Sequence, residues 1–234
     1  MTPKDKQLPI RQLKKIVLDL LCREDFDAAI EEILALPPRR SVNPLFSFLY
    51  HGDPQIRWRA VTALGTVTAA LADREMEPAR VVFRRLMWSL NEESGGIGWG
   101  SAEAMGEIMA RHWKMRKEYL SILLSFLDPE GNFLEHEGLQ QGVLWAAGRV
   151  AQVDPGPVME TAPLIRPFLH VQNASLRATA AWACGAVEDR GAAESLRSIA
   201  DDPERVQLWI DQTLTSATVG QTAHRALEKI TGSC

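Results

Sequence analysis

Four closely spaced glycines form the first candidate site in the sequence. Gly95, Gly96, Gly98 and Gly100 lie within the segment SGGIGWG, residues 94–100. Exposed backbone N–H groups at the start of a helix can bind an anion, and glycine lets a ligand approach the backbone closely. The segment is neither a dinucleotide-binding fingerprint nor a P-loop, because a helical pattern precedes it and no Gly-Lys-Ser/Thr follows. A permissive turn between closely packed helices is the alternative interpretation.

A set of aromatic and polar residues at equivalent helical positions is the second candidate. Tryptophan provides a large contact area and is enriched where partners and ligands bind. The same side chains could instead fill the steps between neighbouring helices, and we favour this interpretation for most of the tryptophans. If a ligand site exists, we expect it near Trp99 and Glu103, one helical turn apart beside the glycine-rich segment. The set comprises Trp58, Trp99, Glu103, Gln141, Trp145, Trp182 and Arg225, whereas Trp88, Trp113 and Trp209 fall outside the pattern.

The composition excludes several classes of protein. Of the 234 residues, 46% are hydrophobic and 24% are charged, and the formal net charge is -4. The acidic excess argues against an indiscriminate nucleic-acid binder, since phosphate binding usually requires a basic excess. Cys22, Cys184 and Cys234 form no CxxC pair, so we expect neither a disulfide framework nor a structural zinc site. No run of about 18 apolar residues occurs, and we expect a cytoplasmic protein without a membrane span.

The candidate residues lie on a helical segment that recurs along the chain. Residues 56–65 (IRWRAVTALG) are followed by residues 97–106 (IGWGSAEAMG), 139–148 (LQQGVLWAAG) and 176–185 (LRATAAWACG), with a weaker copy at 219–228. The last positions of successive copies are 41, 42, 37 and 43 residues apart, close to the period of a two-helix repeat. Each copy places apolar or small residues along one helical face. The pattern predicts the second helix of a repeated helical hairpin.

A shorter apolar segment precedes each copy and predicts the first helix of each hairpin. Asp53, followed by Pro54, and Asn173 are expected N-caps of the first and fourth second helices. The predicted first helices span residues 44–50, 81–90, 119–127, 163–170 and 193–200.

The N-terminal region predicts a cap on this stack. Residues 10–21 and 26–36 have the pattern of two amphipathic helices, and the second is expected to end at Pro37-Pro38. An end repeat needs such a cover because it has no neighbour. We therefore expect residues 1–42 to form a cap that is continuous with repeats at 43–234, as a single solenoid domain.

The fifth unit contains an insertion between its helices. Val206, Leu208 and Ile210 alternate with polar residues, a pattern that predicts a small β-hairpin near residues 205–217, with an irregular loop as an equally weighted alternative. Thr218 and Gln221 have the spacing of a capping box for the last helix.

The copies resemble HEAT repeats of the kind found in phycobilin-lyase-like bacterial proteins, with alanine-rich second helices that end in Ala-Leu-Gly or a variant. The resemblance covers about residues 43–230 and implies an all-α fold, an α-α superhelix of the HEAT-repeat solenoid type. It implies no particular activity, because related repeats serve scaffolds, lyases, hydroxylases and glycosylases.

Glu135-His136-Glu137 is similar to the His-Glu diads that hold iron in the HEAT-repeat protein deoxyhypusine hydroxylase. Such a site needs several diads, and one diad supplies at most two ligands. The other histidines share no spacing and no nucleophile-elbow motif is present, so we predict no metal, no cofactor and no catalytic set. The equivalent positions in other copies carry Asp53-Pro54, Ser94-Gly95 and Asn173-Ala174.

The sequence therefore favours a non-catalytic interaction or scaffold protein that binds a protein, peptide or small ligand on its concave face. The alternative is a DNA-binding or DNA-repair protein resembling HEAT-like alkylpurine glycosylases, which use tryptophan, a carboxylate and arginines on a concave face. These residue types are supplied by Trp58, Trp99, Trp145, Glu103, Arg57 and Arg177, but no basic stripe repeats. A chromophore lyase is suggested by the resemblance alone.

Overall fold

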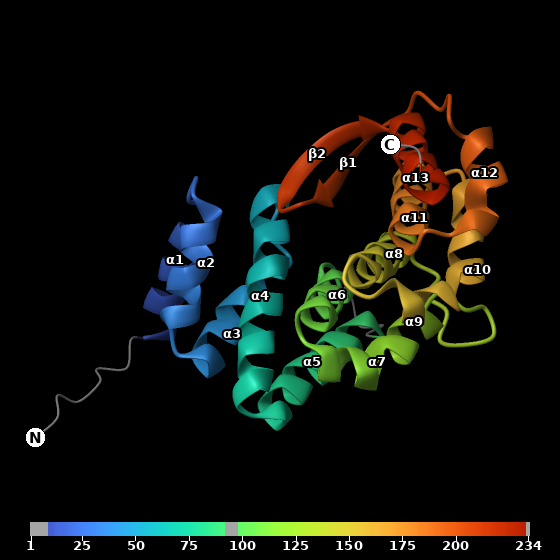
Figure 1. The fold of residues 1–234 in the computed structure, drawn as a ribbon. Coiled ribbons are helices and arrows are strands. Elements are labelled where there is room, and N and C mark those ends of the chain that lie inside the picture. The colour runs from blue at the N-terminus through green and yellow to red at the C-terminus, as the bar shows by residue number, and fades with distance from the viewer. Residues whose placement is uncertain (1–8, 92–97, 233–234) are drawn as a thin grey trace, which may run out of the picture.

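The protein is an all-α repeat solenoid with one small β-hairpin, as the sequence predicts (Figure 1). The computed structural model describes residues 9–91 and 98–232. Helical hairpins follow one another along a curved stack, and no helix in these described ranges is long and apolar enough to cross a membrane. One continuous hydrophobic core extends from Val17 near the beginning to Ile230 near the end. The repeat type, HEAT in particular, stays a prediction.

The second helices of the hairpins form the inner layer, and each contacts the next one along the chain. Their bounds are α4 (Pro54–Arg74), α6 (Ser101–Arg111), α8 (Glu137–Ala151), α11 (Ala174–Val187) and α13 (Val219–Thr231).

The first helices form the outer layer, and they are longest in the second and third units. The fourth and fifth units replace a regular outer helix with short helical pieces. The bounds are α3 (Pro38–Phe48), α5 (Met76–Leu90), α7 (Trp113–Ser125), α9 (Pro155–Met159), α10 (Ala162–Ile165), the 3-10 helix η1 (Arg166–His170), the 3-10 helix η2 (Arg190–Ala192) and α12 (Ala193–Ser198).

The glycine that ends each repeated segment marks the closest approach of successive inner helices. A Cβ at Gly106 would lie 2.6 Å from Ala146 Cα, and one at Gly185 would lie 2.8 Å from Ala226 Cα. Any side chain at these positions would force the helices apart, since interiors are close-packed. The regular glycine spacing therefore reflects the close packing of each inner helix against the inner helix of the next repeat.

The predicted N-caps are present, but several predicted helix starts are wrong. The outer helix α5 begins at Met76 rather than at residue 81, α7 begins at Trp113 rather than at residue 119, and the inner helix α6 begins at Ser101 rather than at residue 97. Asp53 and Asn173 accept N-cap hydrogen bonds at α4 and α11, and Thr218 begins α13 with a capping box. The first outer helix, however, begins at Pro38 rather than at Pro44. Pro38 occupies the first turn, where its missing N–H is not needed, and Pro44 is accommodated inside the helix.

Two N-terminal helices, α1 (Ile10–Leu21) and α2 (Phe26–Ala35), pack against α3 and α4. The buried side chain of Arg59 on α4 connects them to the repeats. Its guanidinium donates to the carbonyl of Leu21 at 2.9 Å and to that of Arg23, and it lies over the ring of Phe26. A cation beside the last carbonyls of α1 also opposes the negative end of the helix dipole.

The predicted hairpin consists of β1 (Arg205–Ile210) and β2 (Thr213–Thr218). Asp211 and Gln212 form its two-residue turn and both have positive φ, 49° and 58°, as a tight hairpin turn requires. Figure 1 shows the hairpin crossing from α11 and α13 to the N-terminal end of α4. At the tip, Gln212 Nε2 donates to Asp27 Oδ1 on α2 at 3.4 Å.

Candidate functional site

A cavity of about 380 Å³ lies between the hairpin and the N-terminal halves of the inner helices. Its volume is within the range of small-molecule sites. Helices α4, α6, α8 and α11 form the walls and the hairpin forms the roof. The lining residues are Pro54, Arg57, Trp58, Trp99, Gly100, Glu103, Gly138, Gln141, Trp145, Ser175, Thr179, Arg205, Val206, Gln207, Leu208, Trp209, Leu214 and Ser216.

The two faces of the hairpin have different roles, because side chains alternate across a strand. Val206 and Leu208 form a small apolar cluster with Ala178 and Val219. The opposite face carries Gln207, Trp209, Leu214 and Ser216, in which Gln207 is paired with Ser216 and Trp209 with Leu214. All four line the cavity. One face therefore holds the hairpin on α11 and α13, and the other completes the site.

A cluster of four tryptophans fixes the hairpin to the inner helices. Trp58 stacks on Trp209 at 5.9 Å between ring centroids and contacts Trp145 at 4.8 Å, and Trp145 stacks on Trp182 at 6.0 Å. Trp145 Nε1 also donates a 2.8 Å hydrogen bond to the backbone carbonyl of Trp209. Buried Trp N–H groups need such a partner. Trp145, Trp182 and Trp209 are buried, whereas Trp58 keeps an accessible face.

Trp99 and Glu103 are both seated against glycines of α8. A Cβ at Gly138 would lie 2.4 Å from a ring carbon of Trp99, and a Cβ at Gly142 would lie 2.7 Å from Glu103 Oε2. Trp99 lies in the turn before α6 and Glu103 lies in the first turn of that helix, whereas Gly138 and Gly142 are one helical turn apart on α8. Gly138 faces Trp99 and Gly142 faces Glu103, so the lack of a side chain at these two positions of α8 leaves room for the indole ring and the carboxyl group.

The carboxyl group of Glu103 has no charged partner at hydrogen-bonding distance among the described residues. Burial raises the pKa of Glu103 to about 7, and the opposing influences are its own backbone N–H and the positive charge of Arg57. Glu103 lies in the first turn of α6, where the helix dipole favours a negative charge. A titratable group so perturbed and facing a cavity is a mark of a functional site.

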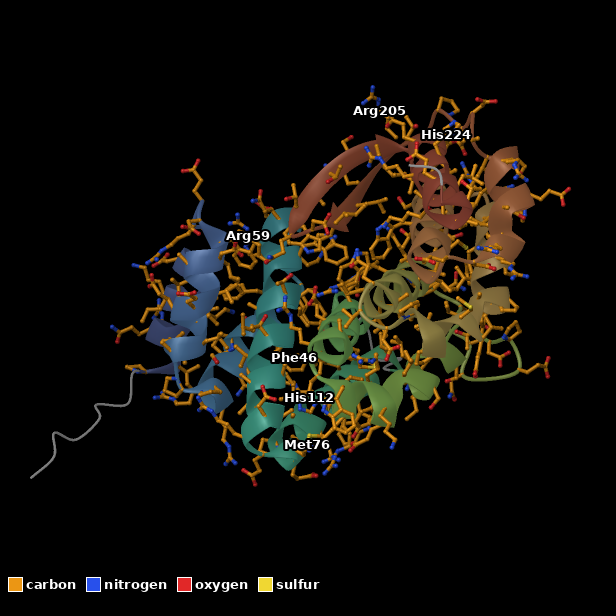
Figure 2. All side chains as sticks on the ribbon, in the orientation of Figure 1. Phe46, Arg59, Met76, His112, Arg205 and His224 are labelled. Atoms are coloured by element: carbon orange, nitrogen blue, oxygen red, sulfur yellow. The ribbon has the colours of Figure 1, made fainter. Side chains whose placement is uncertain are left out.

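Arg57 supplies positive charge to the same cavity from the first turns of α4. Its side chain makes no ion pair or hydrogen bond with the described residues. Arg205 borders the cavity at the root of the hairpin, but its side chain is exposed and Figure 2 shows it directed away from the helices. Arg57 is therefore the arginine whose charge acts on Glu103.

Hydrogen-bonding groups complete the wall formed by α8 and α11. Gln141 Nε2 lies 3.4 Å from Thr179 Oγ1, and Thr179 in turn donates to the carbonyl of Ser175 at 2.7 Å. The carbonyl oxygen of the Gln141 side chain is not used by these contacts. This wall can therefore donate or accept hydrogen bonds toward a ligand.

A second cavity of about 300 Å³ lies on the other side of Trp145 and Trp209. Its main feature is the buried carboxylate of Glu107, which accepts from Arg111 at 2.9 Å and from Arg149 at 3.0 Å. This carboxylate is fully paired, unlike that of Glu103. The second cavity therefore has the chemistry of a structural ion network.

The structure gathers six of the eleven candidate residues around the first cavity. The six are Trp58, Trp99, Gly100, Glu103, Gln141 and Trp145. Trp182 lines the second cavity instead. Gly95 and Gly96 lie outside the described residues. Gly98 packs with its Cα against the backbone of Ser89, where a Cβ would lie 2.4 Å from the carbonyl oxygen, which is a close helix packing contact.

Three further sequence hypotheses can be placed. Arg225 is exposed on α13 and does not line the cavity. Arg177 is committed to Asp202, with Nη2 2.6 Å from Oδ2, and donates to the carbonyls of Val171 and Gln172 just before α11. His136 caps α8 through Nδ1, which accepts from the N–H of Gly138, and its ring lies edge-on to Trp99. No group of three or more potential metal ligands exists within the part that the structure describes.

The sequence reasoning missed Trp209, Gly138 and Gly142. Trp209 lies outside the helical repeat, so helical periodicity gives no reason to place it on the concave face. The alternation in β1 does provide a signal, because Gln207 and Trp209 must share a face opposite Val206 and Leu208. For the glycines, no sequence signal identifies the side chain that each one accommodates.

Comparisons with known proteins bear on the fold. No protein-family model matches the chain. An uncharacterized protein of Archaeoglobus fulgidus is 30% identical over 114 residues, which cover 49% of this chain and 58% of that protein. The chain thus matches little more than half the length of this relative.

Solved structures of designed repeat proteins are similar over nearly the whole chain. A designed armadillo repeat protein in complex with the peptide (KR)4 has a TM-score of 0.52 and 16% identity, over 94% of this chain and 99% of that one. Computationally designed armadillo repeat proteins for modular peptide recognition give a TM-score of 0.51 and 16% identity, over 93% and 99%. At this identity the likeness shows the fold, a helical repeat solenoid.

Proposed function

We propose that this protein is a non-catalytic binding protein that takes a small ligand, or the end of a peptide, into the cavity beneath its β-hairpin. The observation that carries the proposal is the carboxyl group of Glu103, which faces the cavity between Trp58 and Trp99 and has no charged partner within hydrogen-bonding distance. Burying a carboxyl group without a partner costs free energy. A ligand that satisfies this group would offset the cost.

The hairpin decides the kind of occupant. One of the similar solved structures is a designed armadillo repeat protein in complex with the peptide (KR)4. Here Trp209 stacks on Trp58 and accepts from Trp145, so β1 and β2 lie across the inner helices. A long extended chain would have to displace the hairpin to follow the concave face. The geometry therefore favours a compact ligand over a long peptide.

The DNA-binding alternative has less support. Its residue types do meet, because Trp58, Trp99, Glu103 and Arg57 line one cavity. A duplex cannot reach them beneath the hairpin without displacing it. Arg177, the other arginine invoked, is paired with Asp202.

The proposal is tested by thermal unfolding of the purified protein against a panel of metabolites, short peptides and short DNA duplexes. A ligand of the native state raises the unfolding midpoint in proportion to its occupancy. We expect a hit from the small molecules, retained in Trp113→Ala and lost in Trp99→Ala. Trp113 is the matched control, because it is 60% exposed on α7 and does not line the cavity.

Two outcomes would overturn the proposal. One is a panel in which no compound shifts the midpoint of the wild type. The other is a hit whose effect is the same in Trp99→Ala as in the wild type, since the ligand would then bind elsewhere.

A further inference from the structure

The first cavity contains one acidic and one basic group that do not pair with each other. Glu103 projects into it from α6 and Arg57 from α4. The positive charge of Arg57 acts on Glu103, yet the two form no ion pair or hydrogen bond. The carboxylates of Glu107 and Asp202, by contrast, are each paired with arginine. The separation at Glu103 is therefore a particular feature of the cavity.

Glu103 has the surroundings of a binding site for a small cationic group. Its carboxyl group lies flat against the bare backbone at Gly142, with both oxygens within 3.1 Å of the position that a Cβ would take there. The side chains of Trp58 and Trp99 line the same space. Carboxylates form strong charge-assisted hydrogen bonds with ammonium groups, and tryptophan faces attract cations. An ammonium group is thus complementary to this end of the cavity.

Arg57 provides the opposite charge at the α4 wall. A free guanidinium forms bidentate hydrogen bonds with carboxylates. Of the remaining polar lining, Gln141, Ser175, Thr179, Gln207 and Ser216 are neutral, and the side chain of Arg205 is directed away from the helices. A ligand with only an ammonium group would bring a positive charge beside Arg57, and one with only a carboxylate would bring a negative charge beside Glu103. A molecule that carries both groups avoids both repulsions.

We infer that the ligand of this cavity is a small zwitterion of the amino-acid type, with its ammonium group on Glu103, its carboxylate on Arg57 and its apolar part against Trp58 and Trp99. This inference rests on the proposed function, because it names the chemical class of the ligand at that same site. The volume of about 380 Å³ accommodates a free amino acid or a molecule of similar size.

The test uses calorimetric titration of the full-length protein with three matched sets of compounds. The sets are phenylalanine with phenethylamine and 3-phenylpropionate, leucine with isoamylamine and 4-methylpentanoate, and 6-aminohexanoate with pentylamine and hexanoate. Phenylalanine and leucine share the charge separation of an α-amino acid and differ in their apolar part, whereas 6-aminohexanoate holds its charges farther apart, so one of the three is expected to fit. For that set, removing either charged group of the ligand is expected to raise Kd at least about tenfold.

Matched variants assign each charge to its residue. Glu103→Gln should raise the Kd of the zwitterion about tenfold and change that of the amine-free acid less than about threefold. Arg57→Gln should raise the Kd of the zwitterion about tenfold and change that of the carboxylate-free amine less than about threefold. Glu194→Gln and Arg197→Gln on the exposed side of α12 are the controls, with unchanged Kd expected.

Three results would overturn the inference. If the acid or the amine binds as tightly as its zwitterion, or if neither variant changes Kd, the two charges do not recognise the ligand. If no zwitterion binds while another panel compound binds in a Trp99-dependent way, this inference fails and the proposed function stands. If no compound of any class binds, both fail.

Discussion

Gly142 lies directly beneath the carboxyl group of Glu103, and a Cβ at this position would be 2.7 Å from Oε2 and 2.9 Å from Cδ. The contact joins α8 to α6 at the inner end of the cavity. It means that the position of the acidic group depends on a residue that has no side chain of its own.

Gly142→Ala is accordingly expected to displace the Glu103 carboxyl group and to weaken ligand binding at least about tenfold. Its effect on stability should stay within about 1 kcal/mol, because alanine is the better helix former and offsets part of the crowding. Calorimetric titration and urea unfolding measure the two effects. Gly156→Ala is the control, since its Cβ would meet only Asp154, at 3.9 Å. Unchanged binding in Gly142→Ala would contradict the role assigned to this contact.

Glu103 should make the stability of the ligand-free protein depend on pH. Its pKa is raised from 4.5 to about 7 by burial, so between these values the folded state holds a proton that the unfolded state has lost. Stability must then fall as pH rises through this window and stay reduced above it. Solvent in the cavity screens the carboxyl group, so the expected loss in the free energy of unfolding is about 1–2 kcal/mol, less than the full pKa difference would give.

The measurement is urea unfolding of the wild type and Glu103→Gln at pH 5 and pH 8. The variant should gain about 1–2 kcal/mol over the wild type at pH 8 and much less at pH 5. Glu194→Gln serves as the control on an exposed surface of α12. A pH-independent difference between wild type and Glu103→Gln would show that the carboxyl group is not perturbed.

Trp145→Phe should loosen the hairpin. The substitution keeps an aromatic ring but removes the Nε1–H that donates to the carbonyl of Trp209 at 2.8 Å. A buried hydrogen bond of this kind contributes about 1 kcal/mol, and the orphaned carbonyl adds to the loss. Faster hydrogen exchange of the backbone amides in β1 and β2 is the expected result. Trp182→Phe, a buried aromatic change without a hydrogen bond to the hairpin, should leave this exchange nearly unchanged.

Short DNA duplexes are not expected to bind tightly. The net charge is -4, and Arg177 is engaged by Asp202 at the root of the hairpin. Fluorescence anisotropy at low and moderate salt concentration should show Kd values above about 100 µM with little specificity. Tight binding that weakens steeply with salt would instead revive the glycosylase-like alternative.

The sequence predicts the repeats because their determinants are local. The recurring glycines, the apolar helical face and the caps at Asp53, Asn173 and Thr218 act within a few residues of where they occur. The prediction that the first outer helix starts at Pro44 was wrong. A local pattern treats a proline as the start of a helix, whereas here Pro44 is buried inside α3, and its packing is not encoded in the neighbouring residues.

The candidate site was only partly accessible to sequence reasoning. Helical register places Trp58, Trp99 and Glu103 on one side, and the structure places them around one cavity. The roof could not be predicted, because Trp209 reaches Trp58 across 151 positions of the chain. Contacts between residues so distant depend on the curvature of the whole stack, which no segment specifies alone.

The link between the hairpin tip and the cap alters how the whole stack should unfold. A repeat array normally gains stability from nearest-neighbour interfaces alone and can lose its end units one at a time. Here Gln212 contacts Asp27, 185 residues earlier, and Trp209 stacks on Trp58. Fraying of either end must break these contacts, so the terminal units share their stability with the centre. The expected consequence is a single cooperative transition and slow folding for a helical protein, because the long loop must close before these contacts form.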